Sequence, residues 1–129
     1  MTARLTMPRL AADIRTYLDE GDFTMALRWV AQAVTDVRSL TNKQDIGAFF
    51  SAPETTGSTQ WDTLIAGVAE REARRAGVVL PSWCISTGPL VPFWFVTRTP
   101  GLEAYALAHT PTELRIRGVF LDAAELESV

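Results

Sequence analysis

The residues best suited to catalysis are sparse in this chain, beginning with its only histidine, His109, and its only cysteine, Cys84. A single histidine cannot form a two-histidine metal site or a histidine relay within one chain. A single cysteine cannot form an internal disulfide or a thiolate zinc site. We interpret His109 as a helix-terminal residue near the last carbonyl groups, and Cys84 as a buried apolar thiol.

The carboxylates also lack the surroundings that acid–base catalysis needs. Glu70 and Glu72 stand beside arginines, which is typical of a solvated helix face, and other acidic residues occur next to predicted helix ends. No Walker loop, G-x-G-x-x-G, H-E-x-x-H or G-x-S-x-G sequence occurs. The sequence therefore predicts a protein that is not an enzyme and that uses no cofactor and no metal.

Two groups of side chains are instead candidates for binding a partner. The first is aromatic and comprises Trp83, Phe93, Trp94 and Phe95, in a segment that prolines and glycines interrupt repeatedly. Aromatic residues dominate the energetics of interfaces, although in a small domain most of them cover the core. The second group is Arg71 and Arg75, which would stand one helical turn apart and face water or a partner.

Length and composition indicate one folded domain spanning residues 1–129. The chain is 47% hydrophobic and 21% charged, with a net charge of -3, which is typical of a globular protein. The acidic balance disfavours direct nucleic-acid binding and favours a protein or small-ligand partner, with homo-oligomerisation left open. Residues 1–10 lack the apolar run of a signal peptide, and no 18-residue apolar stretch occurs, so we expect a soluble cytoplasmic protein.

Apolar periodicity and capping residues predict a mainly helical N-terminal half. Pro8 fits the first turn of a helix that stops near Gly21, and Asp22 caps a second helix with a wide apolar stripe, expected to be central. Thr41 or Asn42 caps a short third helix. A fourth helix follows a loop at residues 53–58, begins at a capping box of Thr59 and Asp62, and ends at Gly77.

The C-terminal half is predicted to contain a long proline-rich and aromatic-rich loop followed by short helices. The loop spans residues 78–100, and a small hairpin within residues 78–97 is the alternative. A short helix is expected around Tyr105, a second after the capping box that starts at Thr110, and a third after Asp122. The fold class is therefore all-α, a single globular domain of five to seven helices.

Several short motifs follow one another along the chain: T-T-G at 55–57, W-D-T-L at 61–64, A-R-R-A-G at 73–77, P-S-W at 81–83, P-F-W-F at 92–95, T-P at 110–111, R-I-R-G-V-F-L-D at 115–122, and Leu126. Their order resembles a domain of actinobacterial regulators and toxin–antitoxin operons, and the resemblance covers roughly residues 10–129. In such operons the domain is encoded beside an AbiEii-like nucleotidyltransferase. A chain in which eleven of twelve basic residues are arginine is consistent with a bacterial source of that kind.

The resemblance implies an antitoxin-like component that binds and inhibits a nucleotidyltransferase-type toxin. The alternative it leaves open is a regulatory or ligand-sensing domain of a transcriptional regulator. Unlike the fused members of that group, this sequence has no recognisable DNA-binding module ahead of its first helix, so we do not expect it to bind a promoter directly, and a part in DNA binding through a partner is left open.

Overall fold

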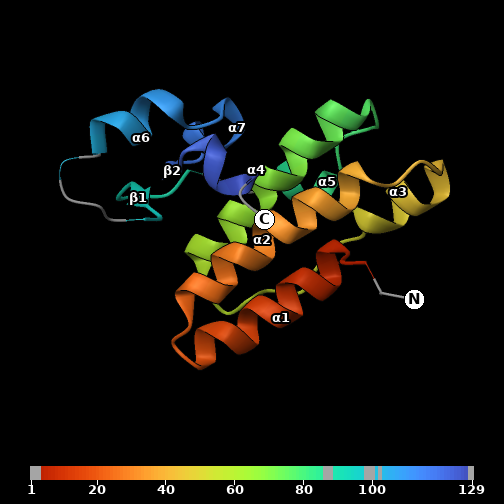
Figure 1. Cartoon of the computed structure of the whole chain (residues 1–129), viewed down its shortest axis with the longest axis horizontal. Helices are drawn as coiled ribbons and strands as arrows, with labels where there is room; N and C mark the ends of the chain where they lie inside the picture. Colours follow the sequence, from red (N-terminus) through yellow and green to blue (C-terminus); the bar gives the residue numbers. More distant parts are fainter. Residues whose placement is uncertain (1–3, 86–88, 98–100, 102, 128–129) are drawn as a thin grey trace.

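A computed structural model describes residues 4–85, 89–97, 101 and 103–127 of the chain, and within them the fold is mainly helical. The described part contains seven α-helices, one short 3-10 helix and two short strands, which confirms the predicted all-α class (Figure 1). In chain order the elements are α1 Met7–Asp19, α2 Phe23–Arg38, α3 Lys43–Phe49, α4 Thr59–Ala76, α5 Ser82–Ile85, β1 Trp94–Phe95, α6 Glu103–His109, α7 Thr112–Arg115, β2 Val119–Phe120 and the 3-10 helix η1 Ala123–Leu126.

Local signals in the sequence set the ends of the first three helices. Thr6 caps α1, with Pro8 in its first turn, and the Asp22 carboxylate caps α2 by accepting from the backbone N–H of Met25. Asn42, rather than Thr41, caps α3. A cap accepts hydrogen bonds from otherwise unsatisfied N–H groups, so these polar residues fix where each helix begins.

The ends of α4 follow the same rules, with its start displaced by one residue from the predicted capping box. Ser58 is the cap, and the Asp62 carboxylate accepts from the backbone N–H of Thr56 at 2.7 Å and from the hydroxyls of Thr55 and Thr56. Gly77 ends the helix with φ of 71°, a left-handed conformation that suits glycine.

The central helix is α4, and not α2 as the apolar stripe suggested. Residues 63–70 of α4 are buried without a break, and the helix contacts α1, α2, α5, α7 and β2. In Figure 1, α2 crosses α4 on one side and α7 and β2 lie on the other. A helix that is covered on all sides needs small residues for close approach. A Cβ at Gly67 would lie only 2.5 Å from the Leu114 side chain of the α7 segment.

The proline-rich segment contains a short helix, α5, and one strand, and the strand pairs outside the segment. β1 pairs in parallel with β2, with Trp94 opposite Val119 and Phe95 opposite Phe120. The described residues of 78–97 therefore form no hairpin, which would require an antiparallel partner within that segment. Parallel strands need a crossover, and α6 and α7 lie in the crossover between β1 and β2.

The C-terminal helices form where they were predicted, but the expected cap at Thr110 is absent. Pro111 precedes α7 and makes no side-chain cap. The Thr110 hydroxyl instead donates to the carbonyl of Ala106 and accepts from the backbone N–H of Leu121 at 3.0 Å. Thr110 thus ties α6 to the segment after β2. None of the helices in the described ranges is long and apolar enough to cross a membrane.

Candidate functional site

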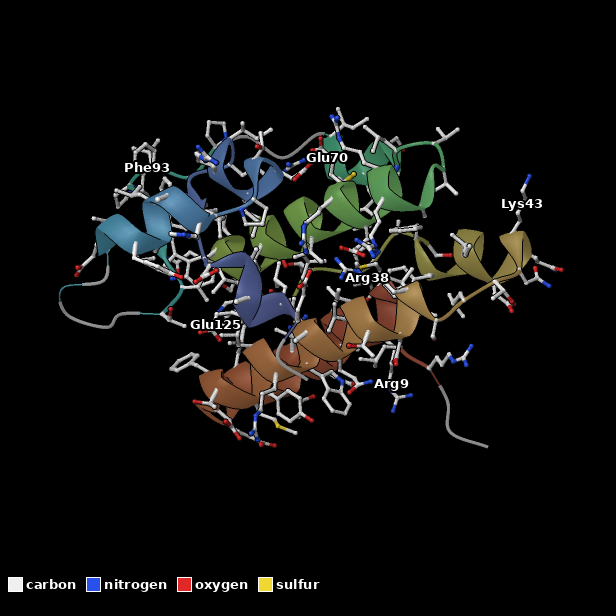
Figure 2. All side chains as sticks on the ribbon, turned by 45° about the horizontal axis from the view of Figure 1, so that its top comes forward. Arg9, Arg38, Lys43, Glu70, Phe93 and Glu125 are labelled. Carbon is white, nitrogen blue, oxygen red and sulfur yellow. The ribbon has the colours of Figure 1, made fainter. Side chains whose placement is uncertain are left out.

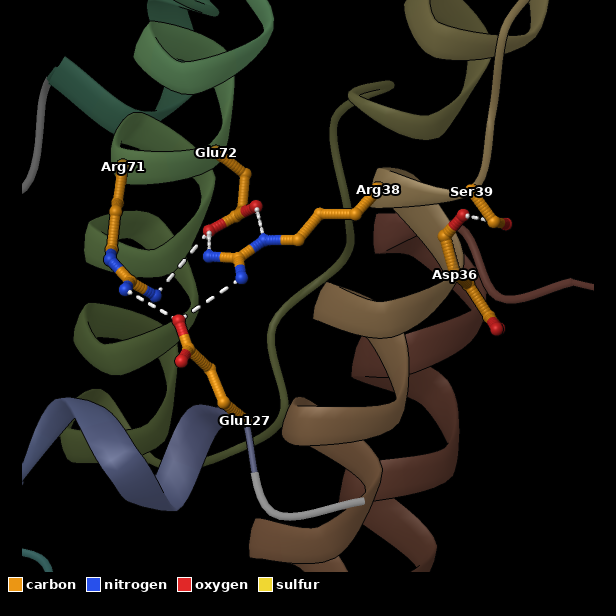
Figure 3. Close-up of polar contacts among 6 residues, drawn as sticks. All are labelled: Asp36, Arg38, Ser39, Arg71, Glu72 and Glu127. Atoms are coloured by element: carbon orange, nitrogen blue, oxygen red, sulfur yellow. Dashed lines mark hydrogen bonds and ion pairs between the residues drawn. The ribbon is translucent and has the colours of Figure 1, made fainter.

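Two ion-pair networks hold the helices around α4, and both contain carboxylates that were predicted to face solvent. The Glu72 side chain is only 1% exposed, and Arg38 of α2 holds it with two parallel contacts, Nε to Oε1 at 2.8 Å and Nη2 to Oε2 at 3.0 Å. Arg71 lies 3.4 Å from the second oxygen. Figure 3 shows that Glu127, after η1, closes the group by contacting both arginines. The expectation of a solvated face for Glu72 is therefore wrong.

The second network surrounds Glu70, whose side chain is 8% exposed. Arg117 lies 2.7 Å from Oε1, and Arg74 lies 2.8 Å from Oε2. Arg117 also donates to the carbonyls of Glu113 and Cys84. Glu70 is therefore also buried, because residues 113–117 cover the face of α4 that sequence periodicity left to water. The Arg117 guanidinium therefore joins α4, α5 and the α7 segment.

The protonation of these groups reflects their pairing. Burial alone raises the pKa of Glu70, but the hydrogen bonds from Arg117 and Arg74 outweigh it and leave the pKa below its usual value. The Arg38 and Arg71 contacts lower the pKa of Glu127. The Glu72 hydrogen bond raises the pKa of Arg38. All these shifts favour the charged forms, which is the signature of structural pairs and not of an acid–base catalyst held near neutrality.

Cys84 and His109 occupy structural positions. Cys84 is fully buried, donates from Sγ to the Pro81 carbonyl at 3.0 Å, and has a raised pKa because burial disfavours the thiolate. His109 is the last residue of α6, as predicted, with Nδ1 2.8 Å from the Tyr105 carbonyl and its ring stacked on that tyrosine. Among the described residues no group of three or more histidine, cysteine or acidic side chains is arranged to hold a metal ion.

The four candidate aromatic residues do not form one surface. Trp83 is half-buried, and its indole N–H donates to the Phe50 carbonyl at 2.9 Å, which fixes α5 against the end of α3. Trp94 is half-buried on the core side of β1 and meets Trp61 edge-to-face at 5.5 Å. Both indoles therefore have intramolecular partners.

Phe95 lies on the other face of β1, since alternate residues of a strand point to opposite faces, and Phe93, which directly precedes the strand, lies on the same side as Phe95. Their rings flank Phe120 of β2, at centroid distances of 5.4 and 5.2 Å. Phe120 is buried, Phe95 is half-buried, and Phe93 is 65% exposed. Figure 2 shows Phe93 at the edge of the molecule. Phe120 was not among the candidates, because its run of residues at 115–122 carries no local signal for a strand.

The candidate arginines have different surroundings. Arg71 is held in the Glu72–Glu127 network, whereas Arg75 is exposed and lines a small pocket of about 260 Å³ together with Arg38 and Glu72. The paired residues of this network, above all Arg38 and Glu127, could not be found from the sequence, because their contacts span residues far apart in the chain.

Exposed apolar side chains concentrate in the second half of the chain. Of the large apolar residues that are exposed in the described part, six lie between residues 85 and 116: Ile85, Val91, Phe93, Tyr105, Leu107 and Ile116. Val91, Phe93, Tyr105 and Leu107 belong to the β1 and α6 region, which Figure 1 shows at one end of the molecule. We call these four residues, with Phe95, the β1–α6 surface.

The α6 helix contributes to this surface because it contains no buried residue. A seven-residue helix has little stability of its own in water, and such helices are usually stabilised by tertiary packing of an apolar face.

Comparison with known proteins does not assign a role to the β1–α6 surface: no protein-family model, no curated protein and no solved structure matches the chain.

Proposed function

We propose that the chain is a non-catalytic protein-binding domain and that the β1–α6 surface is its contact with the partner. The observation that carries the proposal is the exposure of Val91, Phe93, Tyr105 and Leu107 on elements that lie at one end of the molecule. Exposed apolar and aromatic residues concentrated in one region of a molecule are typical of interfaces, whereas single exposed apolar residues need no explanation.

The described residues support a binding contact that depends on complementary shape and not on a catalytic side chain. The Glu70 and Glu72 carboxylates of α4 are paired with arginines, and the thiol of Cys84 is buried. Phe93 is supported from below by Phe120, so it is a partly preorganised anchor. Anchors held in place before binding lose less conformational entropy on association.

The proposed partner is a nucleotidyltransferase-type toxin, as the resemblance in the sequence implies. Bound through the β1–α6 surface, this chain would act as an antitoxin-like component by covering or distorting the nucleotide or acceptor site of the toxin. Blocking a cleft requires complementary surface and no catalytic group, which agrees with the pairing of the buried Glu70 and Glu72 with arginines.

The proposal is tested by measuring affinity for a nucleotidyltransferase encoded beside this gene, using Phe93→Ser and Leu107→Ser variants. Each should weaken binding by about 2 kcal/mol, roughly thirtyfold, with little change in melting temperature. Val79→Ser is the matched control. Val79 is 91% exposed but follows the far end of α4, so its loss should not affect binding. Unchanged affinity in both surface variants, or no measurable complex, would contradict the proposal.

A further inference from the structure

A second surface, away from the β1–α6 surface, has the features of a small-ligand site. It is a groove of about 500 Å³ between α2 and η1, lined by Thr24, Met25, Leu27, Arg28, Trp29, Gln32 and Glu125. Figure 2 shows Glu125 on η1, beside α2. Its volume lies in the range of about 300 to 1,000 Å³ that is usual for pockets that bind small organic molecules.

The floor of the groove is apolar and held in place. The Trp29 indole N–H donates to the Asp13 carboxylate at 2.8 Å, and its ring meets Tyr17 edge-to-face at 6.1 Å. Because its polar atom is already bonded, Trp29 offers only ring surface to the groove. Met25 lies one helical turn before Trp29, and both Met25 and Leu27 are half-buried and line the same groove. The three side chains therefore give the groove apolar surface that an apolar group would cover.

The charged side chain of α2 in the groove is Arg28. It is exposed and makes no ion pair or hydrogen bond with any residue in the described ranges. The Asp13 and Asp36 carboxylates are already bonded, since Asp13 binds Arg9 and Trp29, and Asp36 binds Gln32 and the backbone of Leu5. A guanidinium above an apolar floor is complementary to a carboxylate that carries an apolar group.

We propose that this groove binds a small organic acid with one carboxylate and an aliphatic or aromatic group. The carboxylate contacts Arg28, and the apolar group covers Met25, Leu27 and Trp29. Glu125 on the opposite wall disfavours a ligand with two negative charges. The site is independent of the proposed partner contact, because it uses a different helix and none of the residues of the β1–α6 surface.

The test is a titration of the full chain followed by amide NMR shifts, with octanoate and phenylpropionate as the probes and their neutral amides as controls. We expect saturable shifts at residues 24–32 and 125 with at least one acid, and weaker binding of its amide. The probe that binds more tightly distinguishes an aliphatic from an aromatic ligand.

Arg28→Gln should weaken binding of the acid about tenfold, as expected for loss of a charged hydrogen bond, and Arg28→Lys should largely preserve it. Arg15→Gln is the matched control, because Arg15 is also an exposed arginine, lies on α1 and does not line the groove. Three results would each overturn the inference: no saturable shift at these residues with either acid, equal affinity for acid and amide, or equal effects of Arg28→Gln and Arg15→Gln.

Discussion

Two helices of this chain differ in how they are supported. The helix α4 is buried along residues 63–70 and contacts elements from both halves of the chain, whereas α6 has no buried residue. Both were predicted from local sequence patterns, so helix formation alone does not distinguish them. The difference shows that α4 holds the domain together, while α6 and its neighbour β1 leave apolar surface uncovered. This difference supports the proposed division into a folded body and a binding end.

The largest expected effect on the folded body comes from Glu72→Gln. Removing this charge leaves Arg38 and Arg71 without their most buried partner, and we expect a loss of about 3 to 4 kcal/mol in the free energy of unfolding. Glu127→Gln is the control, because Glu127 contacts the same arginines but is 49% exposed. It should cost less than about 1 kcal/mol by urea denaturation. Equal losses in the free energy of unfolding for the two substitutions would show that burial of the carboxylate does not determine how much each ion pair contributes to stability.

Trp94 of β1 and the preceding residue, Phe93, point to opposite sides. Replacing each by alanine compares the contribution to stability of a core-facing side chain with that of a surface side chain. Trp94→Ala should lower stability by about 2 to 3 kcal/mol, because the indole packs on Trp61 and the core. Phe93→Ala should lower it by about 1 kcal/mol or less, because most of this side chain is exposed. Thermal unfolding measures both. A larger loss for Phe93 would mean that the β1–α6 surface is part of the core.

The close approach of α7 to α4 is tested by a pair of helical glycines. An added Cβ at Gly67 would meet Leu114 at 2.5 Å and the Glu113 carbonyl at 3.2 Å, so Gly67→Ala should destabilise the domain by about 1 to 2 kcal/mol. A Cβ at Gly47 in α3 would meet nothing within 4 Å. Gly47→Ala should therefore stabilise the domain by up to about 1 kcal/mol, through helix propensity. The same sign for both substitutions would contradict the packing described for α4.

The smallest expected effect is the loss of stability as the pH falls below 4.5. The folded-state pKa values of Glu70 and Glu127 lie below the ordinary value of 4.5, so their contribution is present above that pH. It is lost as the pH falls below 4.5 towards the lowered values, because the unfolded chain then binds more protons. Stability measured from neutral pH to about pH 3 should decline in this range, and Glu127→Gln should show a shallower decline. If stability declined with the same slope against pH in the wild type and in Glu127→Gln, Glu127 would not contribute to the acid dependence.

Local sequence signals predicted the helices well because their causes lie within a few residues. Asp22, Asn42 and Gly77 act on backbone groups of their own helix, so their effect can be read from the sequence. Glu70 and Glu72 were misplaced on a solvated face, because the residues that cover them come from distant parts of the chain. The same reason explains why the strand at Val119–Phe120 was missed, since it exists only through pairing with β1.

The candidate binding residues were predicted only in part. Aromatic residues in the proline-rich segment were recognised, but the sequence could not tell that Trp83 and Trp94 face other residues of the chain while Phe93 faces outward. A small hairpin within residues 78–97 was the predicted alternative, but the sequence did not indicate which side of its strands would face the core. Tyr105 and Leu107 were not chosen, because a short helix with apolar residues is normally expected to bury them.

Amide hydrogen exchange of this chain, alone and with the proposed nucleotidyltransferase partner, tests the proposed division into body and binding end most directly. In the free chain, amides of α6 should exchange much faster than those of α4, because the helix lacks buried contacts. Addition of the partner should slow exchange at residues 91–97 and 103–109 and leave α4 unchanged. Equal protection of α4 and α6 in the free chain, or partner-induced protection confined to α1 and α2, would contradict the account.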